Sequence, residues 1–143
     1  MIPPLQRRRD AAQATLDRFK DQPFAFGKND CVRLVAFHLR KLGYRPQLAK
    51  AGTYRTALSA RRALERAGFG SLAEALDAIG LERIAPAAVI VGDVVQCEGD
   101  DELGALAVYV GNGRILGYSE DAAGAVVMQS LKIDLAWRAP PHV

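Results

Sequence analysis

The sequence is poor in the residues that usually build metal sites and disulfide frameworks. Its 143 residues include two cysteines, Cys31 and Cys97, and two histidines, His38 and His142. Two cysteines are too few for a disulfide scaffold, and no pair among these four residues has the spacing of metal ligands. We therefore expect neither a structural metal nor a bound cofactor.

Long hydrophobic stretches are missing as well. The uncharged stretch at residues 84–92 in the second half is far too short to cross a bilayer. Near the N-terminus, three consecutive arginines precede an amphipathic, charged stretch, which is unlike a secretory signal peptide. We expect a soluble protein that is made in a cytoplasm and does not insert into membranes.

The charged residues are divided unevenly along an otherwise ordinary globular composition. Hydrophobic residues make up 50% of the chain, which excludes wholesale disorder, and the length predicts a single domain over residues 1–143. Residues 1–70 carry 15 basic and 5 acidic side chains, whereas residues 71–143 carry 4 basic and 11 acidic ones. This division predicts opposed charged faces. The basic half has no Lys/Arg-rich run with interleaved aromatics, so we expect no nucleic-acid partner.

Helical periodicity fills the first half of the chain. The apolar spacing predicts helices over residues 5–21, 31–42, 54–67 and 71–80. The second of these follows a natural N-cap, Asn29 or Asp30, and its apolar residues cover more than one stripe. We therefore expect this helix to be central and buried. Ser71 and Glu74 have the spacing of a capping box.

The periodicity changes near Pro86. Short β-branched or aromatic runs predict strands over residues 89–96, 103–110, 114–118, 125–129 and 132–137. The pair Asn112-Gly113 is a strong hairpin signal between two of them. Helices followed by an antiparallel meander predict an α+β fold, with N-terminal helices packed on a C-terminal antiparallel sheet.

Cys31 is the first candidate for catalysis. It follows Asp30 at the start of the predicted central helix, where the helix dipole stabilises a thiolate. A cysteine nucleophile normally needs a histidine base. His38 is seven residues further along the same helix, about 10.5 Å away, and His142 lies in a penultimate position where we expect little restraint. From the local pattern alone, a small apolar core residue is the favoured interpretation of Cys31.

Two other features could carry chemistry but have simpler explanations. Cys97 ends a predicted strand, and we expect it to be a buried strand cysteine. Asp100, Asp101 and Glu102 could bind a cation, but they lack the spacing of an EF-hand loop. We expect these carboxylates to form a solvated acidic loop.

The order of three motifs resembles the NlpC-like branch of the papain-type cysteine peptidases. The motifs are an aromatic-Gly-x-x-Asp-Cys segment that ends at Cys31, a Gly-Asp-hydrophobic strand at residues 92–95, and Ala-Leu-Ala-Val-Tyr-Val-Gly-Asn-Gly at residues 105–113. More narrowly, the sequence resembles a compact branch of this group that is encoded in tail gene clusters of bacteriophages and prophages. The Ala-Trp-Arg at residues 136–138 fits that branch.

The resemblance implies a papain-like, NlpC-like fold with Cys31 in the position of the family nucleophile. It also implies a degenerate site, because the family histidine falls on Ala105 and the third polar residue falls on Gly117. Alanine cannot accept a proton, glycine cannot orient an imidazole, and loss of the base removes nearly all rate enhancement. We expect no imidazole within hydrogen-bond reach of the Cys31 sulfur, and apolar neighbours such as Ala105 or Leu106.

Three functions are compatible with these features. The first is a non-catalytic structural or assembly component of a phage or prophage tail, at the tail tip or baseplate, bound to other tail chains. The second is an active thiol hydrolase that cleaves peptidoglycan peptides with Cys31 and a base from an atypical position. The third is a cytoplasmic module that binds a ligand in the inherited cleft. Candidate protein-interaction residues are Arg7, Arg8, Arg9, Arg61, Arg62, Glu98, Asp100, Asp101 and Glu102.

Overall fold

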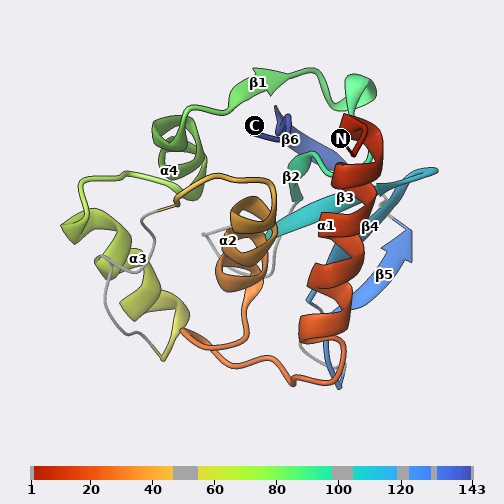
Figure 1. Cartoon of the computed structure of the whole chain (residues 1–143). Coiled ribbons are helices and arrows are strands. Elements are labelled where there is room, and N and C mark those ends of the chain that lie inside the picture. Colours follow the sequence, from red (N-terminus) through yellow and green to blue (C-terminus); the bar gives the residue numbers. More distant parts are fainter. Residues whose placement is uncertain (1, 47–54, 98–104, 119–122, 130–131, 143) are drawn as a thin grey trace.

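The computed structural model describes residues 2–46, 55–97, 105–118, 123–129 and 132–142. In these ranges, four α-helices are followed by a six-stranded antiparallel sheet (Figure 1). This is the α+β fold that the sequence predicts. None of these helices combines the length and the apolar character that a membrane crossing requires.

Side-chain caps set where the helices begin. The helices are α1 (Pro4–Phe19), α2 (Cys31–Lys41), α3 (Ala57–Arg66) and α4 (Leu72–Ile79). Asp30 caps α2, as predicted, by accepting a hydrogen bond from the Arg33 N–H. Helix α3 begins three residues later than the periodicity predicts, because Thr56 and Ser59 form a reciprocal capping box.

The sheet is more than the meander that the sequence predicts. Its strands are β1 (Glu82–Ile84), β2 (Val94–Cys97), β3 (Ala105–Gly111), β4 (Arg114–Gly117), β5 (Val126–Gln129) and β6 (Ile133–Arg138), and a 3-10 turn, η2 (Pro86–Ala88), follows β1. Their order is β1-β6-β2-β3-β4-β5. Strands β2 to β5 form the meander, but β6 returns to pair with β2. The expectation of a simple meander is therefore wrong for the last strand.

Two further differences from the sequence prediction lie between α4 and β2. Strand β1 was not predicted, since its three residues are too few for a periodic signal, and it pairs at the edge of the sheet with β6. Strand β2 begins at Val94 and not at residue 89, because a turn precedes it. In that turn Gly92 has a φ of +90°, and the Asp93 carboxylate accepts a hydrogen bond from the Ile90 N–H at 3.0 Å.

The hairpin between β3 and β4 is confirmed. It is a two-residue connection in which Asn112 has a φ of +54° and Gly113 a φ of +75°. Positive values at both central residues are what a type I′ turn needs to match the twist of its strands. Asn and Gly both adopt positive φ values readily, so this hairpin could be predicted from the sequence alone.

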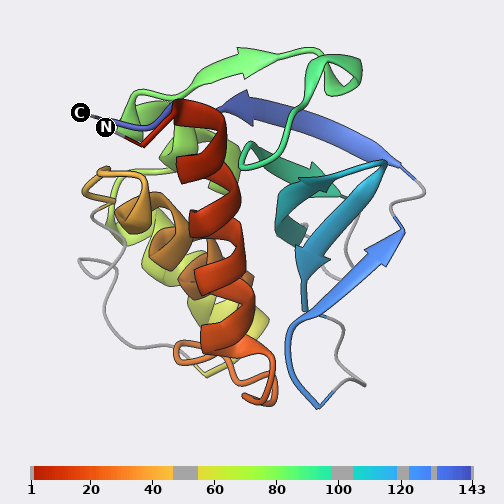
Figure 2. The same cartoon turned by 45° about the vertical axis from the view of Figure 1, so that its right-hand side comes forward.

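Helices α1 and α2 lie side by side on one face of the sheet (Figures 1 and 2). The larger apolar cluster fills the space between these layers and includes Leu34 and Leu39 of α2 with Val94, Val108 and Trp137 of the sheet. A smaller cluster covers the opposite face and contains Val95, Ala107, Ile115 and Ala136. This alternation along each strand follows from the two-residue period of β-structure. Both termini lie at the same end of the molecule (Figure 2).

Candidate functional site

The start of α2 carries Cys31, and the preceding aspartate fixes its conformation. Asp30 is 2% exposed. One carboxylate oxygen accepts from the Arg33 N–H at 2.8 Å and the other accepts from the Gly27 N–H at 2.7 Å. Gly27 has a φ of +78°, which glycine adopts without a Cβ clash. The Gly-x-x-Asp-Cys segment is therefore a capped helix start that places Cys31 in the first turn.

The surroundings of this helix start are apolar and aromatic. Cys31 is half-buried and packs against the larger cluster. The connection from α1 to α2 adds an aromatic group, because the Phe24 ring lies 4.8 Å from the Phe26 ring and 5.9 Å from the Tyr118 ring. Burial raises the pKa of the Tyr118 hydroxyl above its ordinary value.

The two positions that the resemblance assigns to the base and its orienting group lie on adjacent strands. Ala105 begins β3 and Gly117 ends β4. A Cβ placed on Gly117 would lie 3.4 Å from the Ala107 Cβ, which is an ordinary van der Waals contact. Neither residue can accept a proton or hold an imidazole.

His38 is a core residue. It is fully buried, and its Nε2 lies 2.8 Å from the Gly92 carbonyl oxygen. Burial lowers the pKa of His38 below its ordinary value, although the hydrogen bond to Gly92 acts in the opposite direction. His38 is bound to the β2 turn and lies seven residues, about 10.5 Å, from Cys31 on the same helix, so it is too far away to serve Cys31 as a base.

His142 is held at the far end of α2. Its N–H donates to the Leu42 carbonyl at 2.7 Å, its carbonyl accepts from Arg7 Nη1 at 2.5 Å, and its ring lies 3.9 Å from the Tyr44 ring. The expectation of an unrestrained tail is therefore wrong. Because α2 has 11 residues, its two ends are about 16 Å apart. Both histidines of the chain are thus engaged away from Cys31.

A buried ionic network joins α1, the β2 turn and the C-terminal segment. Asp93 is fully buried and accepts from Arg8 Nη1 at 2.8 Å, from the Ala139 N–H at 3.0 Å and from the Ile90 N–H at 3.0 Å. Arg138 Nε lies 3.2 Å from the same carboxylate. The expectation that Arg8 is an exposed docking residue is wrong, because Arg8 is 5% exposed and paired with Asp93.

The sequence contains a signal for this network that the predictions did not use. Arg8 shares a helical face with the buried residues Ala12, Thr15 and Phe19, and this spacing predicts that Arg8 points inward. Gly92 supplies the complementary surface, since a Cβ there would lie 2.9 Å from the Arg8 Cβ. The network is a structural clasp, and no part of it faces Cys31 along α2.

The other predicted interaction residues fall into three groups. Arg7 is half-buried and bound to the His142 carbonyl. Arg9, Arg61 and Arg62 are exposed. The acidic candidates Glu98, Asp100, Asp101 and Glu102 lie outside the described residues.

Cys97 and Cys31 belong to opposite faces of the sheet. Cys97 is half-buried against the smaller cluster, whereas Cys31 packs against the larger one. Over the described ranges, no three His, Cys, Asp or Glu side chains are grouped so that they could hold a metal ion.

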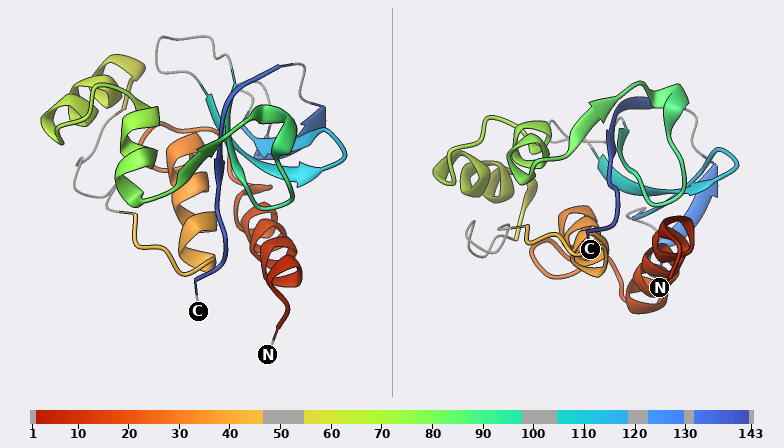
Figure 3. Two further views of the ribbon diagram at one scale, coloured as in Figure 1. Left: turned by 90° about the horizontal axis from the view of Figure 1, so that it is seen from above. Right: turned by 45° about the horizontal axis from the view of Figure 1, so that its top comes forward.

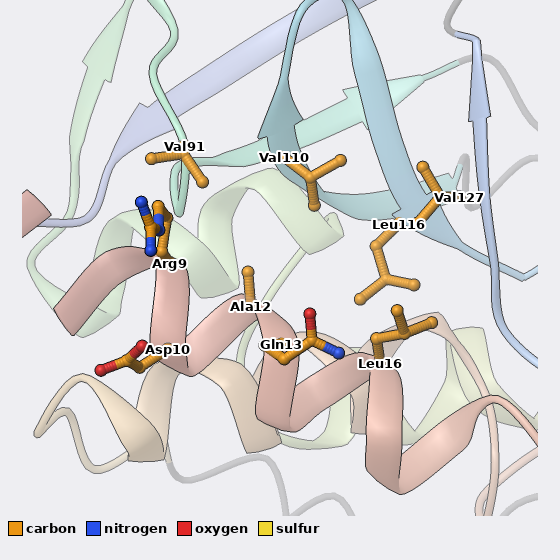
Figure 4. A pocket seen from close by; sticks show the side chains of 9 residues that line it. All are labelled: Arg9, Asp10, Ala12, Gln13, Leu16, Val91, Val110, Leu116 and Val127. Atoms are coloured by element: carbon orange, nitrogen blue, oxygen red, sulfur yellow. The ribbon is translucent and has the colours of Figure 1, made fainter. Parts of the chain in front are cut away.

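A groove of about 290 Å³ lies between α1 and the sheet (Figure 4). Ala12 and Leu16 of α1 face Val110, Leu116 and Val127 across it. Its remaining lining residues are Arg9, Asp10, Gln13 and Val91. The groove can accept an apolar group, but neither Cys31 nor the two family positions lines it. It is therefore a different concavity from the cleft that the resemblance implies.

Comparison with solved structures identifies the fold. The protein described as NlpC2 from Trichomonas vaginalis matches with a TM-score of 0.58 at 16% sequence identity, over 94% of this chain and 47% of that chain. The chain therefore has the NlpC-like fold that the resemblance implies, and it spans about half the length of this neighbour. No curated protein matches the chain. A family model matches residues 4–139, and the chain belongs to that family, which is described as a domain of unknown function (DUF6950).

Proposed function

We propose that this chain is a non-catalytic NlpC-like domain that binds other protein chains, as a structural or assembly component of a phage or prophage tail at its tip or baseplate. In this role it is made in the cytoplasm and ends in the virion tail. One observation carries the proposal. Cys31 keeps its place at a capped helix start, while Ala105 and Gly117 stand where the base and its orienting group would be.

Nucleophilic catalysis by Cys31 would require a base. A nucleophile and its base act as a unit, so that loss of one member removes most of the rate enhancement. His38 is bound to Gly92, and His142 is held beside Tyr44. The described part of the chain therefore offers Cys31 no imidazole. A fold that remains while its chemistry is lost is best explained by a binding role.

The tail assignment is supported by the resemblance to compact NlpC-like proteins of tail gene clusters and by the distribution of charge. A basic N-terminal half and an acidic C-terminal half suit a protein that sits between two different neighbours. Complementary fields of this kind fix the orientation of docking and raise association rates.

The acidic segment provides a direct test of the tail role. We expect mass spectrometry of purified virions to detect the wild-type protein. Changing Glu98, Asp100, Asp101 and Glu102 to lysine should reduce incorporation and leave the melting temperature unchanged, because loop charges contribute little to core stability. A wild-type protein that is present in cells but absent from virions would overturn the tail role. Equal incorporation of both proteins would exclude this segment as a docking surface.

A thiol hydrolase is the second candidate, and the position of Cys31 at a helix N-terminus favours it. Its base would have to come from an atypical position or from a partner chain. The test is hydrolysis of peptidoglycan stem peptides by the wild-type protein and by Cys31→Ser. We expect the same background rate for both. Turnover that disappears in Cys31→Ser would establish the hydrolase and overturn the non-catalytic assignment.

A further inference from the structure

Helix α3 lies at the periphery of the molecule and buries little of its surface against the core. It lies away from the sheet in both views of Figure 3. Only Ala63 and Leu64 of its ten residues are buried. The helix is nevertheless well formed, because its N-terminus carries the complete Thr56–Ser59 capping box. A capped helix that buries so little surface in its own chain is available for contact with another one.

The outward face of α3 is cationic. Arg61 is paired with Glu65, the next acidic residue on the same helix, at 3.7 Å. Arg55, Arg62 and Arg66 are also exposed, and none of them forms an ion pair within the described residues. An arginine without an intramolecular carboxylate keeps its bidentate donors for a partner.

The acidic residues of the neighbouring α4 do not neutralise this face. The Glu74 carboxylate accepts a hydrogen bond from the Gly70 N–H. The Asp77 carboxylate accepts from Arg83 at 2.8 Å and from the Trp137 indole at 3.0 Å, and these two hydrogen bonds lower the pKa of Asp77. The carboxylates nearest in sequence to α3 are therefore already engaged.

Leu58 adds an apolar centre to the cationic face. Its side chain is 58% exposed, the largest value among the exposed large apolar residues of the described chain. Helical spacing places Leu58 next to Arg62, four residues on, and Arg66 follows one turn later. Arginine is enriched at protein interfaces and their hot spots, and an exposed leucine between arginines gives such an interface an apolar contact.

We propose that the face of α3 formed by Leu58, Arg62 and Arg66, together with Arg55 just before the helix, docks on an acidic protein surface, with Leu58 in an apolar depression that carboxylates border. This inference rests on the proposed function, since it names the chemistry of one neighbour. The charge of the face selects an anionic partner. Leu58 selects a protein over a nucleic acid, because residues 55–66 contain no aromatic side chain on which bases could stack.

The experiment places a photo-crosslinking amino acid at position 58 in the full chain, in cells that assemble particles. The cross-linked peptide is identified by mass spectrometry. We expect a protein segment rich in Asp and Glu, with a cross-link yield that falls as salt rises. The triple variant R55E/R62E/R66E should reduce the yield by about tenfold. Glutamate is a good helix former, so α3 should persist, and circular dichroism checks this.

A matched control has the same change in charge elsewhere on the surface. The variant K20E/K28E/R114E reverses three exposed basic residues outside α3 and should leave the cross-link yield within about twofold of the unreversed chain. The decisive arm changes the identified carboxylates of the partner to lysine. This change should restore cross-linking to the R55E/R62E/R66E chain.

Each outcome separates this inference from the proposed function. Virions that contain the protein, without a cross-link from position 58 to an acidic protein, would overturn the α3 surface and leave the tail role standing. A specific acidic protein partner in cells, with no protein in virions, would uphold the surface and overturn the tail role. Cross-links to nucleic acid, or equal losses in both triple variants, would also overturn the inference.

Discussion

Two buried aspartates lie in the motifs that give this chain its NlpC-like character, and they stabilise the fold in different ways. Asp30, at the start of α2, binds backbone N–H groups three residues away on either side, at Gly27 and Arg33. Asp93, before β2, binds groups from distant parts of the chain, including Arg8 and Ala139. The first aspartate is a local cap, and the second is a tertiary clasp.

The comparison shows that both motifs serve the fold. Both aspartates are structural, because every hydrogen bond described for them satisfies a backbone or arginine donor of the same chain. The chemistry of the family would depend on Ala105 and Gly117, and these small residues fit strand positions without altering the fold. We therefore expect that loss of either aspartate reduces the stability of the domain.

The largest effect should come from removing the clasp. We expect Asp93→Ala to lower the free energy of unfolding by about 3–5 kcal/mol, because it leaves the Arg8 cation buried without a partner. The measurement is urea denaturation. Asp134→Ala is the control, because Asp134 is exposed and its contact with Lys132 is a surface pair. Equal losses for the two variants would show that the clasp contributes no more than a surface charge.

Removing the cap should have a smaller effect. We expect Asp30→Ala to lower the free energy of unfolding by about 1–2 kcal/mol, the usual range for an N-cap. Asp30→Asn keeps one acceptor and should recover part of the loss. Urea denaturation measures both. A larger loss for Asp30→Ala than for Asp93→Ala would reverse the order of the comparison, and would mean that the loop before Cys31 is the more tightly coupled region.

The same distinction explains what could be predicted from the sequence. The N-cap at Asp30 and the turn at Asn112-Gly113 are local, so residue type and spacing were sufficient. The strand pairing of β6 with β2 and the ion pair of Arg8 with Asp93 bring together segments far apart in the chain. Arg8 was assigned to the surface because arginines usually are, although its spacing with Ala12 indicated the core.

The candidate site was predictable in part for a similar reason. Cys31 stands at a locally encoded helix start, and its position was correct. The His142 side chain was expected to be unrestrained, but its contact with Tyr44 depends on how the C-terminal segment crosses the end of α2. The groove beside α1 was not predicted, since Leu16, Val110 and Val127 come together only when the sheet meets the helix.

A third test compares the Asp30 cap with the Asp93 clasp through the pH dependence of stability. Only the clasp has a buried imidazole, that of His38, beside it. Burial lowers the pKa of His38, and Arg8 and Asp93 are the charged groups that act on it. The unfolded chain therefore takes up a proton before the folded one does as the pH falls below about 6.5. Stability from this group is complete above that pH and is lost progressively below it.

We expect the free energy of unfolding of the wild-type protein to fall between about pH 7.5 and pH 5.5. The His38→Gln variant should be less stable at neutral pH, because it changes the contact with Gly92, but it should lack the part of the pH dependence that His38 supplies. Urea denaturation at several pH values gives both slopes. Parallel curves for the two proteins would contradict the assignment of His38 to this titration.

The smallest effect should come from placing a histidine at position 105, the first residue of β3, and measuring hydrolysis. We expect Ala105→His to leave hydrolysis of peptidoglycan stem peptides at background, because Gly117 still offers no group to orient the ring, and a base must be held in place to act. Ala105→Gln controls for the added volume at the start of β3. Turnover by Ala105→His that vanishes in the Cys31→Ser double variant would contradict this expectation. It would mean that the scaffold still positions Cys31 for attack, and that the loss of one side chain alone separates this domain from a hydrolase.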